Sequence, residues 1–252
     1  MKKIFFTICS LWILNNTYAQ THLGIGFQMI FPTEAYREAT NDVGVGGGFN
    51  IWVPFAREVP VFFGLDFGYS LMGTNERRIN AYANIIASNG QVLGTIPINY
   101  RIRTNNNFLH THAGIRVKAP LPMVQPYAEG LIGFNYLYTR TKIFDESPNN
   151  SADPDQDTQI TASNQLSDFA FSYGAGGGVM LKLGGNIGLD LRVVYLIGND
   201  ADYYRDEDIE QWEITLSNPN PNGVPQEAEV EDSFTTSATN VFYANLGLVI
   251  AF

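Results

Sequence analysis

The chain has 252 residues, of which 25 are acidic and 15 are basic, and its sequence pI is about 4.7. Such an acidic chain is a poor candidate for binding nucleic acid, because nucleic-acid interfaces require clustered basic side chains. Its length fits one all-β domain or two small domains. After residue 20, no apolar run approaches the roughly eighteen residues that a membrane-spanning helix needs.

Residues 1–19, MKKIFFTICSLWILNNTYA, have the layout of a secretory signal peptide. Two lysines precede an apolar run that is too short to cross a bilayer, and small or polar residues follow it. We predict cleavage after Ala19, which leaves residues 20–252 as a single domain. Cleavage also removes Cys9, the only cysteine, so the mature chain has 13 basic and 25 acidic residues and no disulfide.

In the rest of the chain, apolar residues alternate with small or polar ones in segments of ten or more residues. This period of two indicates strands with one apolar face, and strands of about ten residues suit a membrane-spanning barrel. In the C-terminal NVFYANLGLVIAF, for example, every second residue from Phe252 back to Phe242 is apolar. Eight strands are predicted, at residues 22–32, 42–54, 60–73, 106–118, 125–141, 166–183, 187–198 and 238–252.

Short and long connections alternate between these strands. The short ones are residues 55–59, 119–124 and 184–186, and the others are residues 33–41, 74–105, 143–165 and 199–237. This alternation predicts an all-β fold, an eight-stranded antiparallel up-and-down transmembrane β-barrel with short periplasmic turns and long extracellular loops. Both termini then lie on the periplasmic side. An apolar stretch from Ala81 to Ile98 is expected to extend two strands beyond the membrane.

A soluble β-sandwich would also show alternating strands, but its polar face would carry many solvated charges. Here the polar faces are rich in glycine and poor in charge, which suits the narrow interior of an eight-stranded barrel. Aromatic residues also gather where the strands should leave the outer leaflet, as in an interfacial girdle. They are Phe31, Tyr69, Tyr136, Tyr138, Phe169, Phe171, Tyr195 and Phe242. Recovery of the folded protein without detergent would favour the soluble β-sandwich over the membrane barrel.

The polar faces bring a nearly neutral set of charged residues into the barrel or to its lower rim. They are Asp66, Arg116, Lys118, Glu129, Lys182, Asp190 and Arg192. Unpaired charges in a narrow lumen would be costly, so we expect mutual salt bridges. A tight turn near residues 119–124 places Arg116 opposite Glu129 and predicts a hydrogen bond between them. The set is interpreted as a plug that fills the barrel, with an ion or proton path as the alternative.

Two further groups of residues could bind metal. His110 and His112 share one strand face and could ligate zinc, but only with further ligands that the sequence does not assign. We expect structural histidines that point away from lipid, which disfavours a lipid-facing catalytic site. Asp153, Asp155 and Asp157 are spaced like calcium ligands, but the glycine and glutamate of that motif are absent.

The fourth loop, residues 199–237, is strongly acidic and contains several prolines. We expect a solvated, partly mobile segment. Divalent cations that bridge it to lipopolysaccharide, or a basic partner docked on it, are alternatives without a supporting motif.

The signal peptide, the amphipathic strands, the segment QPYAEGLIG at residues 125–133 and the terminal Phe252 resemble the outer-membrane β-barrel domain family. This family includes the OmpA transmembrane domain and the PorT-like proteins of Bacteroidota, and the resemblance covers nearly the whole mature chain. It implies an outer-membrane location and, through the PorT-like proteins, an association with protein secretion. A terminal aromatic strand also resembles the signal that the barrel-assembly machinery recognises.

The expected function is that of a non-enzymatic, structural or accessory outer-membrane protein that needs no cofactor. Its expected partners are outer-membrane lipid and lipopolysaccharide, the assembly machinery and a larger outer-membrane protein complex. A subunit of a transport or secretion complex and a membrane-embedded hydrolase are the alternatives. Residues 238–252 are expected to close the barrel against residues 22–32, with Phe252 as the assembly signal.

Overall fold

The computed structural model describes residues 20–40, 43–56, 59–86, 92–146, 158–205, 207, 209, 214–217, 227–230 and 234–252. The proposed signal peptide and the candidate calcium ligands Asp153, Asp155 and Asp157 lie outside these residues. Most of the described residues belong to β-strands. Among them, no helix has the length and apolar character needed to cross a bilayer.

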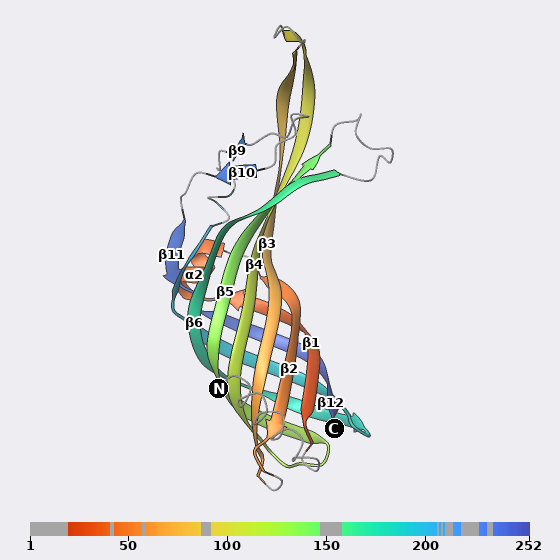
Figure 1. Ribbon diagram of the computed structural model, residues 1–252. Helices are drawn as coiled ribbons and strands as arrows, with labels where there is room; N and C mark the ends of the chain where they lie inside the picture. The colour runs from red at the N-terminus through yellow and green to blue at the C-terminus, as the bar shows by residue number, and fades with distance from the viewer. Residues whose placement is uncertain are drawn as a thin grey trace, which may run out of the picture.

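Eight antiparallel strands form a closed barrel in the order β1-β12-β7-β6-β5-β4-β3-β2 (Figure 1). Their bounds are β1 His22–Pro32, β2 Gly44–Pro54, β3 Val61–Ile86, β4 Val92–Lys118, β5 Val124–Asp145, β6 Thr158–Gly184, β7 Ile187–Gly198 and β12 Val241–Ala251. Every neighbour in the barrel is also a neighbour in sequence among these eight strands, except at the seam, where β12 pairs with β1. The predicted eight-stranded, up-and-down topology is therefore confirmed.

The seam closes as the sequence predicts. Leu23 lies opposite Ile250, and the pairing continues to Pro32 opposite Val241. Beyond the strand ends, the Thr21 backbone N–H donates to the Phe252 carbonyl at 3.1 Å, and the Phe252 N–H donates back at 2.9 Å. The terminal phenylalanine is thus held by its backbone, while its side chain remains exposed.

The two faces of the strands have opposite chemistry. Along β12, Leu246 and Leu248 are exposed, whereas Tyr243 and Asn245 on the other face are buried. The same phase runs through the other strands, so that large apolar side chains cover the outside of the barrel, while glycine, polar and charged residues lie inside together with some apolar ones. The predicted strand faces are confirmed.

The three short connections lie at one end of the barrel. Their tightness follows from local hydrogen bonds, such as Phe55 N–H to the Val61 carbonyl at 2.8 Å and Ala119 N–H to the Pro126 carbonyl at 2.8 Å. In the β6–β7 turn, Gly184 and Gly185 have φ values of 138° and 56°, a region that side chains with a Cβ atom rarely adopt.

At the other end, four strands extend beyond the barrel, and the β3–β4 hairpin extends farthest (Figure 1). β3 and β4 remain paired as far as Ile86 and Val92, and β5 follows β4 as far as Asp145 opposite Tyr100. The extension predicted for the segment from Ala81 to Ile98 is confirmed, and its pairing is a hairpin of β3 with β4. We call the parts of β3, β4, β5 and β6 beyond the barrel the protruding sheet.

Two of the connections at this end contain structure that the sequence interpretation did not include. A short helix, α2 (Glu34–Thr40), lies between β1 and β2, and its Tyr36 ring meets the Tyr203 ring edge-on at 5.0 Å. The fourth loop contains β8 (Asp200–Tyr203) paired with β11 (Thr235–Ala238), and β9 (Ile214–Ser217) paired with β10 (Glu227–Val230). The solvated, partly mobile segment expected here therefore contains paired strands, and β8 and β11 continue the pairing of β7 with β12.

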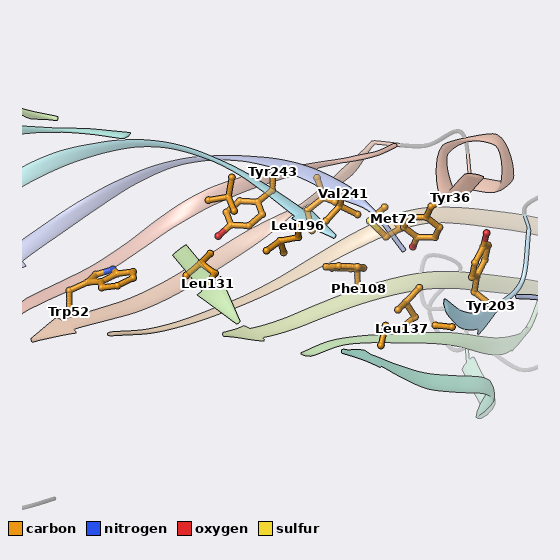
Figure 2. Packing of buried hydrophobic residues seen from close by; sticks show 14 of the residues in the cluster. Tyr36, Trp52, Met72, Phe108, Leu131, Leu137, Leu196, Tyr203, Val241 and Tyr243 are labelled. Atoms are coloured by element: carbon orange, nitrogen blue, oxygen red, sulfur yellow. The ribbon is translucent and has the colours of Figure 1, made fainter. Parts of the chain in front are cut away.

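Buried hydrophobic residues extend along the inside of the barrel (Figure 2). Trp52 lies at one end of this cluster, Leu196 and Tyr243 lie near its middle, and Tyr36 and Tyr203 lie at the other end (Figure 2). Trp52, Leu196 and Tyr243 have no exposed surface. The lumen is therefore packed with side chains.

Candidate functional site: a charged and histidine-lined lumen

The centre of the lumen contains a chain of alternating charges from strands that are not neighbours. Arg192 on β7 donates from Nη1 to Asp66 Oδ1 on β3 at 2.6 Å, and from Nε to Glu129 Oε1 on β5. Both carboxylates and the guanidinium are almost fully buried. These bonds cross the lumen rather than follow the wall, and they tie three strands of the barrel together.

Arg116 extends the chain on the other side of Glu129. Its Nε and Nη2 donate to Glu129 Oε2 at 3.0 and 2.8 Å, so the predicted hydrogen bond is present, with Arg116 opposite Glu129 in the register. The guanidinium lies over the rings of Trp52 and Tyr127, 4.1 and 3.9 Å from their centroids. Two aromatic faces thus replace part of the hydration that burial removes.

The remaining charged residues lie toward the end with the short turns. Asp190 accepts a hydrogen bond from Tyr127 at 2.8 Å. Lys118 Nζ lies 3.3 Å from His22 Nε2 and 4.7 Å from the centroid of the Phe62 ring.

Lys182 departs from the predicted network. Its side chain is exposed, because it comes two residues before the β6–β7 turn, where the barrel wall ends. A residue such as Lys182 can therefore share the inward-facing side of a strand and still be exposed when it lies near the strand end. His22 was missed as a lumen residue, although it shares the face of Gly24 and Gln28 in the alternating pattern.

The buried charges of the lumen balance. Among the described residues, the buried acids Asp66, Glu129 and Asp190 match the buried bases Arg116, Lys118 and Arg192. An interior without net charge lowers the cost of burying ions, provided that each ion keeps partners.

The end of the lumen near the protruding sheet is closed by α2. Glu34 begins this helix with φ 53°, an uncommon conformation for a residue with a side chain. Its carboxylate accepts hydrogen bonds from Asn240 Nδ2 at 2.7 Å and from the Tyr195 hydroxyl at 3.3 Å. These bonds fix the helix to β7 and to the start of β12, and sequence patterns gave no signal for them.

His110 and His112 point into the lumen and have no exposed surface, as their predicted strand phase requires. His110 stacks on Tyr243 with ring centroids 5.1 Å apart. A Cβ atom on Gly68 would collide with the His110 ring, so glycine at this position makes room for the imidazole.

His112 forms a hydrogen bond that resembles a nucleophile–base pair. Its Nε2 lies 2.7 Å from Ser172 Oγ, and Ser172 donates to Asn135 Oδ1 at 3.0 Å. All three residues have no exposed surface, so a substrate cannot reach Ser172 in this conformation. The arrangement acts as a structural hydrogen-bond chain between β4, β6 and β5.

The protruding sheet has ion pairs of its own. Arg103 donates two hydrogen bonds to Glu76 at 3.1 and 2.9 Å, and Arg101 lies 3.1 Å from Glu146. These groups are partly exposed to solvent. The hydrogen bonds from Arg103 lower the pKa of Glu76.

No protein-family model matches the chain, and no curated protein matches it significantly. Solved structures that match it include Ail, the attachment invasion locus protein of Yersinia pestis, which is 13% identical with a TM-score of 0.42 over 94% of this chain and 100% of that chain. Neisserial surface protein A, NspA, is 10% identical with a TM-score of 0.40 over 92% and 97% of the two chains. A major outer membrane protein from Thermus thermophilus is 13% identical with a TM-score of 0.46 over 92% and 99%. These similarities are too weak to carry a conclusion about function.

Proposed function

We propose that the protein is a non-enzymatic, non-conducting integral protein of the bacterial outer membrane, which anchors the protruding sheet outside the cell. One observation carries the proposal: the barrel is apolar outside and charged inside. Ile25, Phe27 and Ile132, for example, are 65%, 51% and 54% exposed, while Arg192 and Glu129 are buried. Water would oppose this distribution, whereas the hydrocarbon of a bilayer favours it.

Outward-facing aromatic residues support a membrane boundary at each end of the wall. Near the protruding sheet, the ring centroids of Tyr136 and Phe169 are 4.4 Å apart, and those of Phe31 and Phe242 are 6.2 Å apart. At the end with the short turns, Phe55 and Phe63 have ring centroids 5.5 Å apart. Aromatic side chains favour the interface between lipid and water, where outer-membrane lipid and lipopolysaccharide would surround the barrel.

The membrane location is tested by expressing the full chain and separating the membranes. We expect the protein in the outer-membrane fraction, extractable only with detergent, because its exposed apolar wall requires lipid or detergent contact. Recovery of the folded, monomeric protein from the soluble periplasmic fraction would contradict the proposal and favour a soluble barrel.

The absence of conductance follows from the packed lumen. We expect no steady current when the purified protein is inserted into planar bilayers, because Arg116, Trp52 and the Arg192 network occupy the interior. A steady current that disappears after heat denaturation of the sample would instead support the ion-path alternative.

We further propose that Phe252 contributes to recognition by the barrel-assembly machinery. Its exposed side chain sits at the seam, where β12 pairs with β1 and closes the barrel. Deletion of Phe252 is expected to lower the outer-membrane level of the protein more than deletion of one residue from the fourth loop. Equal levels of the two deletion variants would remove this role.

A further inference from the structure

The barrel brings a third potential metal ligand to the two lumen histidines. Asp66, His110 and His112 each offer one ligand atom, and these atoms lie within 4.8 Å of one another. The register explains the grouping, because β3 places Asp66 directly opposite His112 on β4 and His110 is the next inward-facing residue. The sequence pattern showed only the two histidines, since the carboxylate is more than forty positions earlier in the chain.

Three of the four ring nitrogens of this cluster lack hydrogen-bond partners, and the fourth, Nε2 of His112, bonds to Ser172. Within the described residues, neither Nδ1 nor Nε2 of His110 has one, and the same holds for Nδ1 of His112. Both imidazoles have no exposed surface, so these atoms have no access to bulk water. Leaving buried polar nitrogens without partners is unfavourable, and a cation that accepts the one lone pair of each neutral imidazole would give one nitrogen of each ring a partner.

The distance between two of the ligands already suits a metal. His110 Nε2 lies 3.4 Å from Asp66 Oδ2. Two ligands of a tetrahedral zinc ion, each about 2.0–2.1 Å from the metal, are separated by about 3.4 Å. All three ligand atoms lie within 4.8 Å of one another, so a small inward movement of side chains would complete a set of three.

The neighbours of Asp66 leave its second oxygen usable. Arg192 binds Oδ1, whereas Oδ2 faces His110 and accepts a hydrogen bond from the Tyr243 hydroxyl at 2.7 Å. A carboxylate oxygen has lone pairs for both a hydrogen bond and a metal. The positive charge of Arg192 lowers the affinity for a cation, so binding weaker than that of a structural zinc site is expected.

We propose that Asp66, His110 and His112 form a binding site for one divalent transition-metal ion of the zinc class in the lumen. Two imidazoles and one carboxylate are the donor set that zinc accepts and that magnesium and calcium do not prefer. The ion would bind during folding, because the three side chains are closed off in the finished barrel. Its role would be structural, joining β3 and β4 at the middle of the lumen.

The test uses the mature chain without a polyhistidine tag, refolded from urea into detergent with zinc sulfate and then desalted. Bound zinc is measured by elemental analysis in the wild type and in His110→Gln, His112→Gln and His22→Gln variants. His22 is the matched control, because it is a buried lumen histidine outside the cluster and the chain has no fourth histidine. Tryptophan fluorescence, to which buried Trp52 and also Trp212 contribute, checks that each variant has folded.

We expect about one zinc ion per chain in the wild type and in His22→Gln, and at least a tenfold loss in the other two variants. A wild type without stoichiometric zinc would overturn the proposal, and this result does not depend on the folding of any variant. Equal zinc content in all four proteins would also overturn it, because binding would then lie elsewhere, for instance in the acidic loops.

Discussion

The same pairing of arginine with carboxylate occurs in two parts of this protein with different physical consequences. In the lumen, Arg192 joins Asp66 and Glu129 among fully buried side chains. On the protruding sheet, Arg103 donates to Glu76 at 3.1 and 2.9 Å, close to the 3.0 and 2.8 Å from Arg116 to Glu129 in the lumen, but solvent reaches Arg103 and Glu76. Contact geometry alone therefore does not measure what an ion pair contributes to stability.

Environment decides the difference. Burial removes hydration from both ions, so loss of one partner leaves the other charged and unsatisfied in a medium of low polarity. At the surface, water and salt solvate whichever ion remains. Removing one partner of a lumen ion pair should therefore destabilise the protein strongly, whereas removing one partner of an ion pair on the protruding sheet should not.

The largest effect is expected from Arg192→Ala. This change removes the guanidinium that binds Asp66 and one of the two guanidinium groups that bind Glu129, and should lower the free energy of unfolding by about 3–5 kcal/mol. Urea unfolding in lipid vesicles, followed by the tryptophan fluorescence of Trp52 and Trp212, measures it. A loss below about 1 kcal/mol would show that water enters the lumen and that the two regions do not differ as described.

A smaller loss is expected from Tyr243→Phe, which removes the hydroxyl that donates to Asp66 at 2.7 Å but keeps the ring. Hydrogen bonds to charged groups contribute about 2 kcal/mol, and the same unfolding experiment should show a loss of this size. Tyr195→Phe is the matched control, because its hydroxyl donates to Glu34 near the surface at 3.3 Å. Equal losses in the two variants would contradict a special role of burial.

Arg103→Ala tests the exposed ion pair of the protruding sheet. The variant removes two hydrogen bonds to Glu76, yet the free energy of unfolding should change by less than about 1 kcal/mol. The small effect should diminish further at an ionic strength of about 1 M, where screening extends over only about 3 Å. A loss of unfolding free energy as large as that of Arg192→Ala would contradict the difference between buried and exposed ion pairs.

The smallest effect concerns the pH dependence of the protruding sheet. The hydrogen bonds from Arg103 lower the pKa of Glu76 in the folded protein. The contribution of ionised Glu76 to stability is therefore fully present above the pKa that Glu76 has in the unfolded chain, and it is lost as the pH falls through the pKa that Glu76 has in the folded protein. Hydrogen exchange of the β3–β4 hairpin should therefore be slower in the wild type than in Glu76→Gln at neutral pH. The exchange rates of the wild type and of Glu76→Gln should become equal at acidic pH. A difference in rate that persists in acid would show that the substitution acts through packing and not through charge.

Much of the barrel was predictable because its information is local. Alternation within a strand sets which side chains face inward, and a short turn between neighbouring strands sets the register that places Arg116 opposite Glu129. The protruding hairpin was also visible as an apolar stretch between two predicted strands. Helix α2 and the paired segments of the fourth loop were missed, because they are short and are held by contacts such as Tyr36 with Tyr203.

A repeat of two residues in the sequence is enough to count the barrel strands, to assign their inward and outward faces and to place most of the charged residues of the lumen. Which of these residues meet depends on how the barrel closes. Closure of the barrel brings Arg192 to Asp66 and Lys118 to His22, and it leaves Lys182 exposed beyond the wall. Contacts across a lumen depend on the curvature and closure of the whole sheet, which no local pattern contains.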